Sequence, residues 1–117
     1  MNIIVDRPQL VRVVKLYLTK SLGNLIPKTN SNYPDSVFYV NPNNEIMMEY
    51  NQKNYLVYIN YDHIWSKIES LFHLKYSETQ LIMKVWLEEA YKLGGVTPLD
   101  EYLNHLKSWK RLTNWND

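Results

Sequence analysis

The side chains that could perform acid–base or metal chemistry are few and scattered. They are three histidines and two pairs of glutamates: His63, His73, His105, Glu45, Glu49, Glu88 and Glu89. Metal motifs on helices place two histidines four residues apart, and no two histidines here have that spacing. Glu45 and Glu49 would share one side of a strand, but with α-carbons about 13 Å apart, whereas carboxyl groups that share an acid–base task lie about 5–10 Å apart. We therefore expect solvated charges and no metal site.

Signatures of nucleophilic catalysis and of phosphate binding are missing as well. The chain contains no cysteine and no G-x-S-x-G elbow, so neither a thiolate nor an activated serine is indicated. Its glycines are Gly23, Gly94 and Gly95, and the adjacent pair follows an expected helix, where glycine is a stop signal. The sequence therefore predicts a protein that is not an enzyme and that needs no cofactor.

A basic and aromatic cluster near the end of the chain suits nucleic acid. It consists of Lys107, Trp109, Lys110 and Arg111, and cations beside aromatic rings bind single strands through phosphate contacts and base stacking. The same residues also suit the C-terminus of a helix, where Lys and Arg complement the helix dipole. The formal net charge of +1 adds no general attraction to nucleic acid or acidic lipid. Nucleic-acid binding is thus an alternative hypothesis and not the favoured one.

Composition is typical of an ordinary globular protein. The chain has 117 residues, enough for one domain, and its hydrophobic and charged fractions of 45% and 21% are those of a folded, soluble protein. No segment approaches the run of about 18 apolar residues that a membrane span needs, and the start MNIIVDRPQL lacks a secretory pattern. We therefore expect a single domain over residues 1–117, in the cytoplasm and without membrane contact.

Residue usage hints at the source of the chain. There are 13 Asn, 10 Lys and 3 Arg, and a single Ala. Codons for Asn and Lys are AT-rich, whereas those for Ala and most of those for Arg are GC-rich. The pattern is typical of the AT-rich genomes of many phages, viruses and bacteria, and it favours a viral or phage accessory protein.

Hydrophobic periodicity predicts seven elements in the order α-β-β-β-α-α-α, which is an α+β fold. The first helix covers residues 7–22, with Asp6 as N-cap and Gly23 after its end, and residues 24–35 should be a loop. Three strands within residues 36–61 form an antiparallel meander, because apolar and polar residues alternate between two Asn-rich turns. The rest is predicted as helices over residues 62–73, 77–93 and 97–112, followed by a loose tail over residues 113–117.

Symmetric closure of the two turns predicts a register for the meander. It pairs Tyr39 with Ile46, and Met48 with Val57. One face then carries the expected core, which is almost wholly apolar or aromatic: Val37, Tyr39, Ile46, Met48, Tyr50, Tyr55, Val57, Ile59 and Tyr61.

The opposite face of the meander carries an unexpected apolar row. The predicted members are Phe38, Met47 and Tyr58 in the row, Val40 and Leu56 beside it, and Glu45 and Glu49 as a polar rim. Each large apolar side chain left in water forgoes about 1.5–3 kcal/mol, so we expect something to cover the row. One hypothesis is a docking surface for a protein partner or a second copy of the chain. The other is that the first or the last helix folds across it.

The order of the first five elements resembles that of a double-stranded RNA-binding domain. That family packs helices on one face of a three-stranded sheet and grips phosphates with clustered lysines of its second helix. The corresponding segment here opens DHIWSK and lacks such a cluster. The resemblance therefore implies helices on one sheet face, and it assigns no RNA-binding residue.

Overall fold

The computed structural model describes residues 7–60 and 64–101 of the chain. These residues form, in order, α1 (Arg7–Leu22), β1 (Ile26–Asn30), β2 (Tyr33–Val40), β3 (Ile46–Asn51), β4 (Leu56–Asn60), α2 (Ser66–Phe72), α3 (Tyr76–Tyr91) and β5 (Thr97–Glu101). Three helices and a largely antiparallel sheet confirm the predicted α+β class, but the predicted order α-β-β-β-α-α-α is wrong, because there are two further strands and no fourth helix among the described residues.

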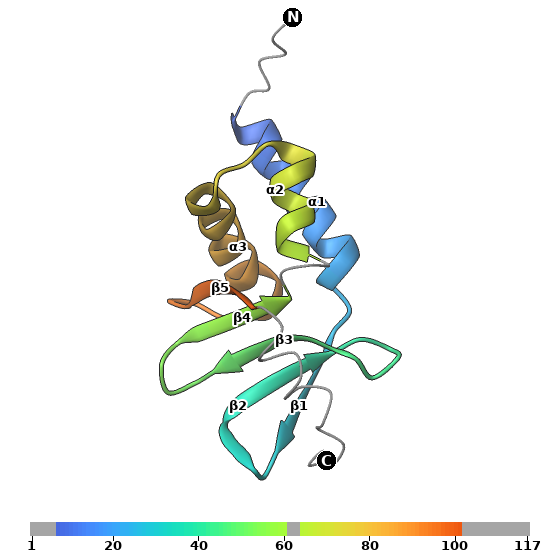
Figure 1. Ribbon diagram of the computed structural model, residues 1–117, viewed down its shortest axis with the longest axis vertical. Coiled ribbons are helices and arrows are strands. Elements are labelled where there is room, and N and C mark those ends of the chain that lie inside the picture. The colour runs from blue at the N-terminus through green and yellow to red at the C-terminus, as the bar shows by residue number, and fades with distance from the viewer. Residues whose placement is uncertain (1–6, 61–63, 102–117) are drawn as a thin grey trace, which may run out of the picture.

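The strands form one sheet in the order β1-β2-β3-β4-β5 (Figure 1). Strands β1 to β4 are antiparallel to their neighbours, whereas β5 runs parallel to β4. A parallel neighbour cannot follow a tight turn, and α2 and α3 provide the crossover that it needs. All three helices gather on one side of the sheet (Figure 1). We call the sheet face that packs on them the inner face, and the opposite one the outer face.

The prediction of a helix from residue 97 was wrong, because residues 97–101 form β5. Thr97 and Pro98 suit an edge strand as well as a helix start, since neither setting needs the N–H that proline lacks. The tertiary partner decides between them: β5 pairs along the whole of β4, and the Thr97 N–H donates to Tyr55 O at 2.8 Å. Residues 102–112 and the predicted loose tail lie outside the described residues.

The predicted loop over residues 24–35 was also wrong, because most of it is a hairpin. β1 and the start of β2 pair there around a turn at residues 31–32. The Asn30 side chain accepts a hydrogen bond from the Asn32 N–H at 2.9 Å, a local bond that stabilises such a turn. Pro27 is tolerated because β1 is an edge strand, where part of the backbone needs no partner.

Helix α1 has the bounds that the sequence predicts. Val14, Leu18 and Leu22 recur every fourth residue along one face and are fully buried. The helix ends before Gly23, whose N–H donates to Thr19 O at 2.9 Å, and a Cβ at Gly23 would collide with the same carbonyl. The expected N-cap residue precedes the described part of the chain.

Helix α3 begins and ends slightly earlier than predicted. The Lys75 N–H donates to Glu78 Oε1 at 3.0 Å, so Glu78 completes the N-terminal cap in place of Gln80. At the other end Lys92 adopts a left-handed conformation with φ 60°, two residues before the glycine pair. A charged residue therefore takes the conformation that the sequence assigns to glycine.

The hairpin between β2 and β3 departs from the predicted register. Tyr39 pairs with Met48, and beyond this pair Val40 faces Ile46, so Met47 is an extra residue in β3. Such a bulge rotates the strand by one residue and changes which side chains share a face. Ile46 therefore aligns with Val40 at the outer face, whereas Met47 packs against the helical core.

The turn of this hairpin explains the bulge. The Asn44 N–H donates to Asn41 O at 2.9 Å, which places Pro42 at the second position of the turn, as predicted. Asn44 then adopts a left-handed φ of 64°, and the Asn41 N–H donates to Glu45 O at 2.9 Å. A type I turn followed by a left-handed residue makes a loop of odd length with a bulge, whereas the prediction assumed an even one.

The hairpin between β3 and β4 is also displaced, but by an even number of residues. Met48 pairs with Ile59 and Tyr50 with Val57, where the prediction paired Met48 with Val57. Tyr55 lies in the turn with a left-handed φ of 57° and is not a strand residue. Because side chains alternate with a period of two, this displacement leaves each strand residue on its predicted face.

The hydrophobic core lies between the inner face and the helices. Its strand residues are Tyr39, Met48, Val57 and Ile59, and its helical side includes Val14, Leu18, Trp65, Ile68, Met83, Trp86 and Leu87. Among the described residues, the buried Trp65 Nε1 has no hydrogen-bond partner, whereas two other polar side chains bond across the core. The Trp86 indole donates to Thr19 Oγ1 at 3.0 Å, and the Tyr91 hydroxyl donates to Leu22 O and accepts from the Leu25 N–H at 3.1 Å.

Candidate functional site

The outer face carries a row of side chains that crosses the whole sheet. Strand pairing places Phe38 opposite Glu49, Glu49 opposite Tyr58, and Tyr58 opposite Leu99, and it continues the row to Lys28 on β1. Residues opposite each other on paired strands project to the same side. We call these five residues the outer row. Its centre is therefore a carboxylate between two aromatic rings.

The composition of the outer row corrects the predicted one. Phe38 and Tyr58 belong to it as expected, but Glu49 takes the place assigned to Met47. Met47 is half-buried and packs against the helical core because of the bulge. Glu49 was predicted at the rim, and its central position could not be read from hydropathy alone.

Several outer-face side chains are buried to the level of a protein core. Phe38 and Val40 are each 1% exposed, and Ser36 and Glu49 are each 6% exposed. The Ser36 hydroxyl donates to Glu49 Oε2 at 2.8 Å, so this buried carboxylate has a hydrogen-bond donor on the neighbouring strand. Ser36 was not predicted as a site residue; two residues before Phe38 on the same strand, it shares the outer face.

The margin of the outer face is more open than its centre. Tyr58 and Leu56 are half-buried, and Glu45 is exposed in the loop before β3. The Asn41 side chain donates to Glu45 Oε1 at 3.1 Å, which holds that carboxylate at the turn. Of the two predicted rim acids, Glu45 thus lies at the edge as expected, whereas Glu49 is enclosed.

The described helices do not account for this burial. They pack on the inner face, and neither Phe38 nor Val40 belongs to the core cluster that the helices complete. The Tyr33 ring meets Phe38 edge to face, with centroids 6.0 Å apart, and covers part of it. Since Tyr33 is itself exposed, one ring does not explain an exposure of 1% at Phe38.

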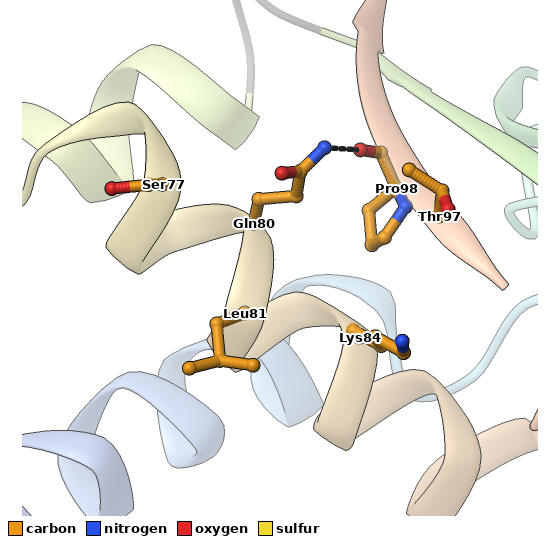
Figure 2. Close-up of a pocket in the computed structure, with 6 residues that line it drawn as sticks. All are labelled: Ser77, Gln80, Leu81, Lys84, Thr97 and Pro98. Carbon is orange, nitrogen blue, oxygen red and sulfur yellow. Dashed lines mark hydrogen bonds between the residues drawn. The ribbon is translucent and has the colours of Figure 1, made fainter. Parts of the chain in front are cut away.

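The two edges of the sheet are poor sites for adding a strand. Pro27 in β1 and Pro98 in β5 remove backbone donors from the outermost strands. The Gln80 side chain also donates to Pro98 O at 2.8 Å and occupies a carbonyl of the β5 edge (Figure 2). A partner that recognises the sheet therefore has more to gain from its outer face than from its edges.

A hollow of about 360 Å³ lies between α3 and β5, and Figure 2 shows the side chains that line it. The residues that line it are Ser77, Gln80, Leu81, Lys84, Thr97 and Pro98. Two hydroxyls, an amide already bonded to Pro98 O and one ammonium group supply neither a general base nor a paired acid. The hollow therefore has no arrangement for catalysis.

The pKa shifts resolved within residues 7–60 and 64–101 belong to three tyrosines. Burial raises the pKa of Tyr39, with smaller contributions from Tyr91 and Tyr50, and burial likewise raises the pKa of Tyr91. Burial, followed by the hydrogen bond that the hydroxyl donates to Asp100 Oδ1 at 2.7 Å, raises the pKa of Tyr76 to about 12. All three move away from neutral pH, whereas a catalytic base needs a pKa near the working pH.

The remaining predicted chemistry is only partly covered by the structure. Within residues 7–60 and 64–101, no group of three or more His, Asp or Glu side chains could hold a metal ion. His73 is exposed at the end of α2. The alternative nucleic-acid residues, Lys107, Trp109, Lys110 and Arg111, lie outside the described residues, so that hypothesis stays a prediction.

No helix in the described part of the chain is long and apolar enough to cross a membrane. Comparisons with family models, with curated proteins and with solved structures found no match for this chain. Its function is therefore inferred from the chemistry of the outer face.

Proposed function

We propose that this protein is a small, non-catalytic interaction protein that binds a segment of a protein partner on the outer face of its sheet. One observation carries the proposal: a buried carboxylate, Glu49, lies between Phe38 and Tyr58 on the face that α1, α2 and α3 leave uncovered. The solvated face of an ordinary antiparallel sheet carries exposed polar side chains instead.

The chemistry of the outer row defines the partner segment. Apolar side chains of the segment would pack on Tyr58 and Leu56, which are half-buried and leave part of their surface accessible. A Lys or Arg of the segment would add one more bond to the Glu49 carboxylate, which already accepts from the Ser36 hydroxyl. The apolar contacts supply affinity and the charge pair supplies register, the usual division between the core and the polar groups of an interface.

Selection of peptides on the intact protein tests the proposal. A phage-displayed library of random peptides should yield binders that combine spaced apolar residues with a Lys or Arg. Glu49→Gln, which keeps the shape and removes the charge, should weaken the selected peptides by about tenfold or more, as expected for loss of a buried charge pair. The matched control is Glu45→Gln, which removes an exposed carboxylate of the same face and should change the affinity by less than about twofold.

Removal of apolar groups from the half-buried part of the outer face gives a second test. Tyr58→Ser with Leu56→Ser should abolish peptide binding while the circular dichroism spectrum stays that of the parent. A loss of folded signal would mean that the row is part of the structural core, and the proposal would then fail. Light scattering of the parent protein shows whether the segment belongs to a second copy: a dimer mass that both substitutions reduce to a monomer would identify self-association as the mode of docking.

A further inference from the structure

The hollow between α3 and β5 follows one face of the helix. Its helical wall consists of residues spaced three, four and seven apart, which share a face of a helix: Ser77, Gln80, Leu81 and Lys84. Thr97 and Pro98 form the opposite wall on β5 (Figure 2). The first and the last residue of the helical wall are separated by about 10 Å along the helix axis. The hollow is therefore long enough to hold a short aliphatic chain along α3.

The two walls of the hollow are held together within the chain. The Gln80 side chain donates a hydrogen bond to Pro98 O at 2.8 Å (Figure 2). The Tyr76 hydroxyl donates to Asp100 Oδ1 at 2.7 Å and joins the start of α3 to β5. A pre-organised site loses less affinity to the ordering of the protein on binding. A ligand would therefore enter a hollow whose walls are already in place.

Lys84 carries the only charge among the described residues that line the hollow, and no acidic side chain in the described part of the chain pairs with it. Three acidic side chains that the structure describes on α3 and β5 are bonded elsewhere: Glu78 to the Lys75 N–H, Glu89 to Lys15 and Asp100 to Tyr76. A fourth, Glu88, lies beside Gly94, where a Cβ would be 3.6 Å from Glu88 Oε1. The hollow therefore offers one positive charge to a ligand.

We infer that this hollow binds a short aliphatic monocarboxylate, with the carboxylate at Lys84 and the chain along Leu81 and Pro98. The volume of about 360 Å³ is within the range of about 300–1,000 Å³ that small-molecule sites have. One ammonium group matches one negative charge, whereas phosphate groups are held by several donors, such as an Arg fork or a row of backbone N–H groups. The hydroxyls of Ser77 and Thr97 are further donors in the same hollow. Such binding does not depend on docking of a partner at the outer face.

Titration of the full-length, ¹⁵N-labelled protein with hexanoate, followed by NMR, tests the site. A ligand of this size in an open hollow should bind with a Kd on the order of millimolar. Saturable shifts should concentrate at residues 77–84 and at Thr97. 1-Hexanol has the same chain with a neutral end, and hexanoate should bind about threefold more tightly, because a charge pair at an exposed lysine contributes modestly. Shifts that do not saturate, or that lie away from the hollow, would overturn the inference.

Removal of the charge at Lys84 tests the recognition of the carboxylate. Lys84→Met keeps the aliphatic stem, so it should reduce the affinity for hexanoate to that for 1-hexanol and leave the affinity for 1-hexanol unchanged. The matched control is Lys67→Met, which removes an exposed lysine of α2 that does not line the hollow and should keep the threefold preference. Equal affinities of the parent for the two ligands, or a preference that persists in Lys84→Met, would refute the site.

A series of chain lengths tests the apolar part of the hollow. The affinity should rise by about fivefold from butanoate to hexanoate, because each buried CH₂ contributes up to about fourfold. Leu81→Ser should reduce this rise to about twofold, and the circular dichroism spectrum should stay that of the parent, because Leu81 is 63% exposed and lies outside the core. Affinity that is independent of chain length would show that Lys84 attracts any small anion, and the inferred ligand class would then be wrong.

Discussion

The two faces of the sheet bury side chains by different means. The inner face meets three helices mainly with apolar groups, and polar atoms nearby, such as Trp86 Nε1 and the Tyr91 hydroxyl, bond to α1 and the residues just after it. The outer face buries a carboxylate and a hydroxyl beside an aromatic ring. A core that serves stability avoids ionised groups. The inner face thus specifies the fold, and the contrast is the reason for proposing that the outer face serves a contact.

Replacement of one large residue on each face should show the largest difference in stability between the inner and the outer face. Met48 is fully buried on the inner face, and Met48→Ala should lower the free energy of unfolding by about 2–5 kcal/mol, because the helices cannot close over the cavity. Tyr58 is half-buried on the outer row, so Tyr58→Ala should cost less than about 2 kcal/mol. Equilibrium urea unfolding measures both. Equal costs would show that the two faces belong to one cooperative core.

The next largest effect concerns a polar bond on the inner side. The Tyr91 hydroxyl joins α3 to the end of α1, through Leu22 O and the Leu25 N–H. Tyr91→Phe leaves both backbone groups without this partner and should lower the free energy of unfolding by about 1–3 kcal/mol. Tyr55→Phe is the control, because Tyr55 is 57% exposed and its loss should stay within about 0.5 kcal/mol. A similar loss of stability in both variants would show that the hydrogen bonds of the Tyr91 hydroxyl do not stabilise the fold.

The inner face was predictable from the sequence because it depends on periodicity. The bounds of α1 follow from a stripe of Val14, Leu18 and Leu22 with a glycine after the helix. The faces of β2 and β4 survived an incorrect pairing, since an even displacement preserves the alternation of side chains. Local patterns of apolar residues therefore sufficed for the part of the molecule that the hydrophobic effect controls.

The outer face was less predictable because tertiary contacts decide it. The left-handed conformation of Asn44 produces the bulge that moves Met47 to the helical core, and asparagine is tolerated there without being required. β5 becomes a strand only because β4 offers an unpaired edge, and its sequence alone suits a helix start equally well. Glu49 looked like a rim residue, since a buried carboxylate has no signature in hydropathy.

The loss of stability at alkaline pH allows a tyrosine at the edge of the sheet to be compared with the tyrosines of the core. The Tyr76 hydroxyl donates to Asp100, and the pKa of Tyr76 is raised to about 12 from 10.0. A raised folded-state pKa means that the folded protein holds this proton more firmly than the unfolded chain. The stabilisation is complete below pH 10 and is lost as the pH rises through about 12. Tyr76 is 40% exposed, so solvent screening keeps the effect small.

Urea midpoints at about pH 9 and about pH 11.5 measure this contribution. Tyr39 and Tyr91 also have raised pKa values. Titration of all three tyrosines should therefore lower the free energy of unfolding of the parent protein over this interval. Tyr76→Phe should lose less over the same interval, because one of the three groups no longer titrates. An equal loss in the parent and the variant would mean that the Tyr76–Asp100 bond does not persist in solution.

The smallest expected effect compares a solvated glutamate with the buried one. Glu89 on α3 accepts a hydrogen bond from Lys15 Nζ at 2.8 Å, with side chains 57% and 27% exposed respectively. An exposed pair of this kind contributes about 0.2–1 kcal/mol and weakens with salt. Glu89→Gln should therefore lower the free energy of unfolding by less than about 1 kcal/mol, and the loss should fade in high salt. Glu49→Gln should have a larger and nearly salt-independent effect, because burial protects that carboxylate from screening. Urea unfolding of both variants at low and high salt makes the comparison, and a similar salt dependence for the two would indicate that Glu49 is open to water in solution.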